Sequence, residues 1–219
     1  MKFVDIENKN VRKTNRNYFW AVTVFYIVLN ISIFAIFKNN NLLWKLQNTK
    51  WGVFNGIKDW FISIGNLYTH NDWGHVLRNM LAFAISAFYI ERKIGSLNFL
   101  GLIVLLSLLS SPLVSMYVGL NWAGSSVIYF AVWGYVIVDY LFSLNKKTRT
   151  KTNLILGGIV IFCKYIGSCL TENLLNTNIF IPVNLIYNAG HYFGFLVGII
   201  ISLLIQIIIL QIKNNKTNN

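Results

Sequence analysis

Residues 124–135 read GSSVIYFAVWGY, so two adjacent hydroxyl side chains stand between a glycine and a long apolar run. A serine hydroxyl is a weak nucleophile unless a base lies within hydrogen-bond reach. Later in the chain, His191 stands near the start of another apolar run. An ionisable side chain is costly inside a membrane-spanning segment, so a residue such as His191 is a candidate functional residue. We predict that Ser126 and His191 meet inside a bilayer as nucleophile and general base.

The composition indicates a membrane protein. The 219 residues are 55% hydrophobic and 12% charged, with a mean hydropathy of +0.54, whereas a soluble domain is about 25% charged. Several apolar runs reach the ~20 residues that a helix needs to cross the hydrocarbon core. We predict an all-α membrane protein with six spans, at about residues 18–37, 75–90, 97–118, 126–144, 154–170 and 189–212. The chain then divides into an N-terminal tail at 1–16, a membrane domain at 17–212 and a C-terminal tail at 213–219.

The net charge of +12 reflects the predicted topology. Lys and Arg gather in residues 1–16, 91–96, 145–151 and 213–216, all on one side of the predicted spans. By the positive-inside rule, both termini of this multi-pass protein of the cell membrane are cytoplasmic. Ser126, His75 and His191 then lie near the outer face. The distribution of charge argues against nucleic acid as a partner and favours the lipid bilayer with its anionic headgroups.

The longest segment between predicted spans, residues 38–74, interleaves aromatic and polar residues. Trp and Tyr prefer the boundary between lipid and water. We expect this first loop to form short amphipathic helices that lie in the outer interface.

The sequence indicates neither a metal nor a cofactor. The only cysteines, Cys163 and Cys169, share one apolar run without a metal-ligand spacing, and no HExxH pattern of a metalloprotease occurs. A small transporter would be expected to show internal repeats and charges in mid-membrane. No convincing repeat is seen, and the polar residues of the spans gather at one depth.

His75 and Asn79 are four residues apart, which places them on one face of a helix. Both side chains can donate hydrogen bonds to one point, as a developing oxyanion requires. Polar residues also hold neighbouring membrane helices together. For these two residues alone, that structural interpretation is favoured.

Three motifs then follow one another at the same predicted depth. The second span holds HVLRN at 75–79, with His70 five residues before it, and ends with Glu91 and Gly95. The fourth begins with GSS at 124–126 and has Gly134 further along, and the sixth holds GHYFGFLVG at 190–198. Each motif is weak alone, and their order makes the set specific. Over about residues 60–212, the sequence resembles the rhomboid family of intramembrane serine proteases.

The resemblance implies a six-transmembrane-helix rhomboid-like bundle with an interfacial first loop. It also implies an endopeptidase that cleaves transmembrane segments of membrane proteins near the outer face. Ser126 is then the nucleophile and His191 the general base of a dyad. The oxyanion would be stabilised by His75, Asn79 and the backbone amide of Ser126.

The same resemblance assigns further residues to the surroundings of this site. Those that support it are Gly124, Phe130 and His70. Those that we expect to serve helix packing are Gly134, Gly194, Gly198, Glu91 and Gly95.

The chain departs from the family pattern next to the nucleophile. Val127 stands where the family has a glycine, and Phe130 keeps the aromatic ring without a hydroxyl. In an alternative register Ser125 is the nucleophile, but Gly134 is then misplaced by one residue, so Ser126 is preferred. Val127 also keeps open a second function, a catalytically inactive rhomboid-like protein that binds or escorts membrane clients. The presence of both Ser126 and His191 argues against that alternative.

Overall fold

The computed structural model describes residues 20–38, 56–119, 122–144 and 189–217, and the regular secondary structure of these residues is α-helical. The helices are α2 (Ala21–Phe37), α4 (Ile57–Asn66), α5 (Trp73–Ile94), α6 (Ser96–Val118), α7 (Ser126–Leu144) and α9 (Ala189–Thr217). The prediction of an all-α protein is therefore confirmed. The N-terminal tail at 1–16, the expected span at 154–170 and both cysteines lie outside the described residues.

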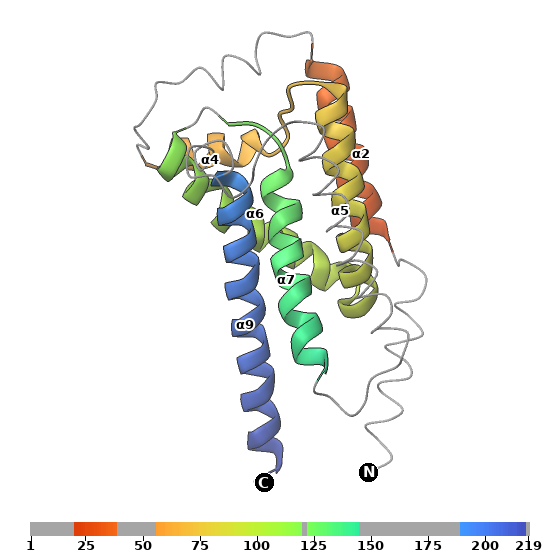
Figure 1. Cartoon of the computed structure of the whole chain (residues 1–219), viewed down its shortest axis with the longest axis vertical. Helices are drawn as coiled ribbons and strands as arrows, with labels where there is room; N and C mark the ends of the chain where they lie inside the picture. The colour runs from red at the N-terminus through yellow and green to blue at the C-terminus, as the bar shows by residue number, and fades with distance from the viewer. Residues whose placement is uncertain (1–19, 39–55, 120–121, 145–188, 218–219) are drawn as a thin grey trace.

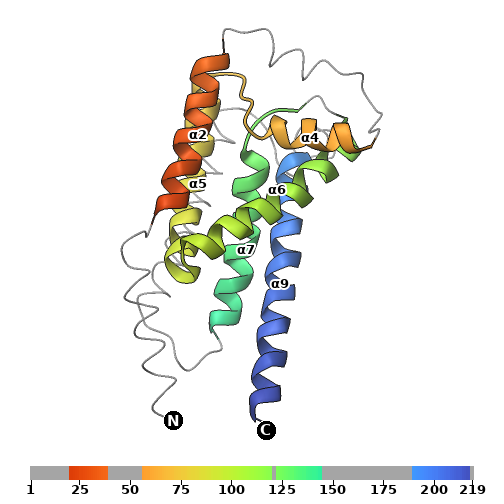
Figure 2. The ribbon, with the colours of Figure 1, turned by 180° about the vertical axis from the view of Figure 1, so that it is seen from behind.

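The helices form two pairs joined by a crossing helix (Figure 1). α7 and α9 run side by side, and α2 packs against α5 on the other side of the molecule. α6 crosses obliquely in front of α7 and α9 in the view of Figure 2, and α4 lies near the upper end of the bundle. α5 stays in contact with α7, so the elements that carry His75, Ser126 and His191 are neighbours.

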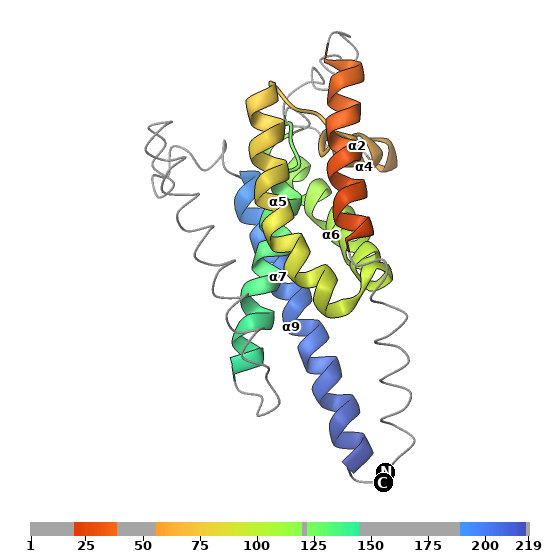
Figure 3. The same ribbon diagram turned by 90° about the vertical axis from the view of Figure 1, so that its right-hand side faces the viewer.

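Among the described residues, two helical segments are long and apolar enough to cross a bilayer, Ser96–Tyr117 and Gly190–Ile212. α2 and α7 are apolar but shorter. α9 continues past the predicted end of the last span as far as Thr217 (Figure 3). A helix need not end where the hydrocarbon ends, because its backbone hydrogen bonds are internal. The count of six spans and the interfacial position of the first loop stay predictions.

α5 begins and ends at residues that suit those positions. Asp72 caps its start, where the carboxylate accepts a hydrogen bond from the His75 backbone N–H at 2.7 Å. Gly95 follows its end with φ +85°, a conformation that glycine adopts without strain, and donates its N–H to the carbonyl of Glu91. The chain turns there and enters α6. Gly95 therefore forms the turn between two helices, and its expected role in helix packing stays a prediction.

Glu91 connects the end of α5 with the start of α2. Its carboxylate is 1% exposed and accepts hydrogen bonds from the backbone N–H groups of Val22 (3.0 Å) and Thr23 (2.9 Å). The hydroxyls of Thr23 and Ser96 donate to it as well, at 2.5 and 2.6 Å. The first N–H groups of a helix have no partner within the helix, and a negative charge there is stabilising. Glu91 joins helices through this cap, rather than through close packing.

A second buried carboxylate, that of Asp139, connects α5, α7 and α9. It forms an ion pair with Lys93 and accepts a hydrogen bond from Gln206 Nε2 at 3.2 Å. Asp139 is 4% exposed and lies thirteen residues after Ser126, which is about 20 Å along α7 at 1.5 Å per residue. The carboxylate is thus engaged far from the start of the helix.

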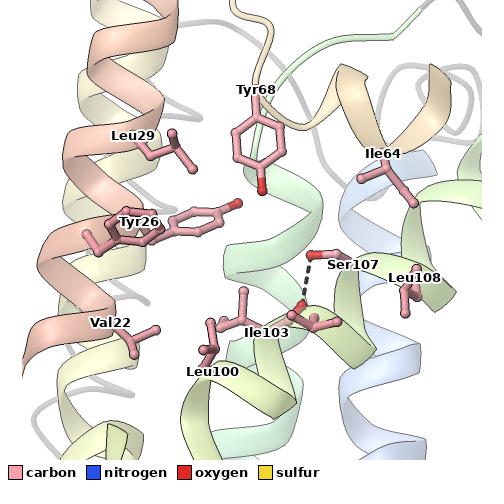
Figure 4. A pocket seen from close by; sticks show the side chains of 11 residues that line it. Val22, Tyr26, Leu29, Ile64, Tyr68, Leu100, Ile103, Ser107 and Leu108 are labelled. Atoms are coloured by element: carbon pink, nitrogen blue, oxygen red, sulfur yellow. Dashed lines mark hydrogen bonds between the residues drawn. The ribbon is translucent and has the colours of Figure 1, made fainter. Parts of the chain in front are cut away.

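An apolar cavity of about 180 Å³ lies between α2, α6 and the end of α4 (Figure 4). Its lining includes Tyr26 from α2, Ile103 from α6 and Tyr68 from the turn after α4. None of the predicted site residues lines it. The cavity therefore belongs to the packing of α2 against α6.

Candidate active site

The segment before α7 is fixed by its neighbours on both sides. Trp122 Nε1 donates to Ser115 Oγ of α6 at 2.7 Å, and the Gly124 N–H donates to the carbonyl of Asn66 at the end of α4 at 3.0 Å. Ser126 is the first residue of α7 and is 8% exposed. The predicted nucleophile thus stands at the start of α7, and the segment that precedes it is hydrogen-bonded to α6 and to the end of α4.

Gly124 occupies a position that no other residue would fit. Its φ is +114°, and a Cβ there would lie 2.8 Å from Nε2 of His75 and 3.2 Å from Nδ2 of Asn79. L-residues rarely adopt such a φ. The absence of a side chain lets the two polar side chains of α5 approach the backbone two residues before Ser126. The structure therefore brings together Gly124 and both residues expected to bind the oxyanion.

The amide of Asn79 is buried, and Nδ2 has no hydrogen-bond partner among the described residues. A buried donor without a partner costs about 1–3 kcal/mol. Such groups are tolerated where function needs them, and a developing oxyanion is a suitable acceptor for this one.

Ser125 faces His70 instead of the sixth predicted span. Its Oγ lies 3.2 Å from His70 Nε2, and its backbone N–H donates to the same nitrogen at 3.4 Å. The carbonyl of Ser125 accepts the first hydrogen bonds of α7, from the N–H groups of Ile128 and Tyr129. Ser125 thereby fixes the start of the helix, and its hydroxyl is engaged on the side of α5.

His70 is buried in the turn between α4 and α5. Burial, and next the positive charge that His75 can carry 5.1 Å away between ring centroids, lower the pKa of the His70 imidazole from 6.5 to about 4. The ring is therefore neutral at neutral pH. A neutral ring has one nitrogen free to accept, and Nε2 is the one that meets the N–H of Ser125.

His191 lies in the first turn of α9, against α7. Its ring stacks on that of Phe130, with centroids 4.3 Å apart and planes inclined by 27°. Phe130 follows Ser126 by four residues, so both side chains lie on one face of α7. The contact therefore puts the imidazole on the face of α7 that carries Ser126, one helical turn along.

Three glycines bring the backbones of α7 and α9 into contact below the two residues of the predicted dyad. A Cβ at Gly194 would overlap the carbonyl oxygen of Val127, and one at Gly198 would overlap that of Ala131. From the other side, a Cβ at Gly134 would overlap the carbonyl oxygen of Phe195. Small residues in a stripe allow this close approach. The spacing of α7 and α9 is thus set by contacts that leave no room for any side chain.

We compared the sequence with models of known protein families. The family model described as Rhomboid domain matches residues 58–207, which is more than half of the chain. The chain belongs to the rhomboid family. No curated protein matches the sequence significantly. Rhomboid proteins are membrane proteins and are generally intramembrane serine proteases, so the matched region, which runs from α4 into α9, is a membrane domain.

The sequence pattern did not reveal the partners of several polar residues. It selected His70 and Glu91 but gave no sign that they bind Ser125 and the start of α2. It also did not show that Lys93, Asp139 and Gln206 meet. The one local signal was Asp72, because an aspartate three residues before His75 is typical of a helix cap. The other contacts join residues more than 40 positions apart, where local spacing carries no information.

Proposed function

We propose that this rhomboid protein is an intramembrane serine endopeptidase. Its substrates are transmembrane segments of other membrane proteins, and its catalytic groups are Ser126 and His191. The observation that carries the proposal is the stacking of His191 on Phe130, one helical turn from Ser126. Nucleophilic catalysis requires a base within hydrogen-bond reach of the hydroxyl, and an imidazole on the face of α7 that carries Ser126 supports such a pair.

In the proposed reaction, His191 accepts the proton of the Ser126 hydroxyl while the oxygen attacks the scissile carbonyl. His191 then gives that proton to the leaving amine, and an acyl-enzyme remains on Ser126. Water, deprotonated by His191, releases the acyl group and restores the hydroxyl. The scheme uses two residues, since Asp139 is engaged by Lys93 near the other end of α7.

The oxyanion would be stabilised by His75, Asn79 and the backbone N–H of Ser126. Support comes from Gly124, whose missing side chain gives the two α5 residues access to the backbone before Ser126. The unpartnered Nδ2 of Asn79 is a donor that an oxyanion could satisfy. Removal of one such donor from a protease typically costs about 10²–10³ in kcat.

We further propose that the protein is a multi-pass protein of the cell membrane with both termini in the cytoplasm and the site near the outer face. The distribution of Lys and Arg supports this orientation. A substrate helix must unwind there, because its peptide bonds are otherwise shielded by helical hydrogen bonds. Protease digestion of a tag at either terminus in intact cells tests the orientation, and digestion from outside would contradict it.

The alternative function is that of a catalytically inactive rhomboid protein that binds membrane clients. Val127 favours it, because the family has a glycine at that position. Val127 is 1% exposed, however, and its side chain is directed at Gly190 of α9.

Labelling of the purified protein with a fluorophosphonate probe separates the two functions. We expect the parent to be labelled, and Ser126→Ala and His191→Ala each to lose the label while keeping the thermal stability of the parent. Ser125→Ala is the matched control and should retain the label. A folded parent that takes up no label would favour the client-binding function. Labelling that depends on Ser125 instead of Ser126 would show that the register is wrong.

A further inference from the structure

The residue after the proposed nucleophile meets the residue before the proposed base. A Cβ at Gly190 would lie 3.0 Å from Cγ2 of Val127, a distance tighter than ordinary van der Waals contact. Val127 is 1% exposed, so its side chain has no open space on the other side. Within a helix, valine has one strongly preferred χ1 rotamer, and the methyl group cannot readily turn away. The isopropyl group of Val127 thus fills the space that Gly190 leaves.

We propose that Val127 and Gly190 are a steric pair that sets the separation of Ser126 and His191. The pair explains how a branched residue is accommodated directly after the nucleophile: the space it needs is provided by the other helix. The proposal rests on the proposed function, since it assigns both residues a role in positioning the dyad. Neither residue touches the substrate in this role.

The neighbouring contacts determine where an added methyl group would act. Gly194 already lies against the carbonyl of Val127, and Gly198 against that of Ala131, so α9 cannot slide or sink toward α7. A methyl group at position 190 would press against Cγ2 of Val127 by a few tenths of an ångström, and we expect the first turns of α7 and α9 to move apart in response. Those turns carry Ser126 and His191. A misplacement of about 1 Å at a reacting pair can cost about 10²-fold in rate.

The experiment measures the rate of fluorophosphonate labelling together with the melting temperature in detergent. We expect Gly190→Ala to slow labelling by at least about tenfold. Val127→Ala removes the obstructing Cγ2 and keeps good helix propensity. The double variant, Gly190→Ala with Val127→Ala, should therefore be labelled at a rate within about threefold of that of Val127→Ala alone. This coupling in a double-mutant cycle is the signature of a direct steric contact.

Two control variants separate this pair from its surroundings. Gly194→Ala meets the backbone of Val127, so Val127→Ala should not rescue it. Gly101→Ala, in α6, has no atom within 4 Å of the new methyl group and should label at the parental rate. The proposal is overturned if Gly190→Ala labels like the parent, or if Val127→Ala leaves the double variant as slow as Gly190→Ala.

A failure of the proposed function gives a different result from a failure of the pair. If the folded parent takes no label, the protease and with it the positioning role are rejected. The steric contact is then judged by the melting temperature alone. Gly190→Ala should lower the melting temperature of the parent, and the same substitution should lower it less in a Val127→Ala background. If the parent labels and no coupling appears, the protease stands and the pair is rejected.

Discussion

At the scale of single residues, Gly124 has two separable reasons to be glycine. We expect Gly124→Ala to lose fluorophosphonate labelling and to be destabilised by about 1–3 kcal/mol from backbone strain alone, because its φ is +114°. The new Cβ would in addition displace His75. Gly56→Ala is the matched control, since its φ is +83° and nothing lies within 4 Å. Gly56→Ala should be destabilised by backbone strain but should keep the fluorophosphonate labelling of the parent. Equal labelling by the two variants would contradict a role of Gly124 in admitting His75.

His70 makes the stability of the fold depend on pH. The pKa of its imidazole is about 4 in the folded protein and 6.5 in an unfolded chain, so between these values the unfolded chain binds more protons. Stability should therefore be complete above pH 6.5 and fall by about 3 kcal/mol as the pH drops to 4. His75 and Asp72 face the same turn and act on this titration. Thermal melts across this range should show the slope in the parent and a much weaker one in His70→Gln. An unchanged slope in the variant would assign the effect to other groups.

At the scale of helices, Glu91 ties α5 to α2 through three hydrogen bonds and to the start of α6 through a fourth. Glu91→Ala would leave two N–H groups at the start of α2 without a partner, and we expect a loss of about 3 kcal/mol in the free energy of unfolding. Glu91→Gln keeps one acceptor oxygen and should lose less. Lys58→Ala, on the exposed side of α4, is a control that should stay within about 0.5 kcal/mol of the parent. A Glu91→Ala variant as stable as the control would contradict the capping role.

Sequence reasoning succeeded best where a helix is defined by its own residues. The start of α7 at Ser126 follows from a glycine, two hydroxyls and an apolar run, and the apolar residues after His191 predict α9. The end of α9 at Thr217 was not predicted, because apolar patterning reports the membrane and not the helix. For the candidate site, motif order selected the residues, but the spacing could not show that the hydroxyl of Ser125 would face His70. That contact depends on how α5 is placed against α7.

At the scale of the whole molecule, the buried carboxylate of Asp139 joins three helices, through an ion pair with the exposed Lys93 of α5 and a hydrogen bond from Gln206 of α9. We expect Lys93→Met to cost about 1–3 kcal/mol, because the buried carboxylate of Asp139 loses its charged partner. The double variant Lys93→Met with Asp139→Leu should be markedly more stable than Lys93→Met alone. Denaturant unfolding in detergent measures both. If the loss in the double variant equals the sum of the losses in Lys93→Met and Asp139→Leu, the ion pair does not bridge these helices.

The cap on α2 also has a consequence for the order of assembly. Chains are synthesised from the N-terminus, and Glu91 follows Thr23 by 68 residues. α2 therefore leaves the ribosome long before the carboxylate that completes its start has been made. Until α5 arrives, water, headgroups or insertion factors must satisfy those N–H groups. A truncation before residue 91 should therefore leave α2 inserted without the carboxylate that caps its start.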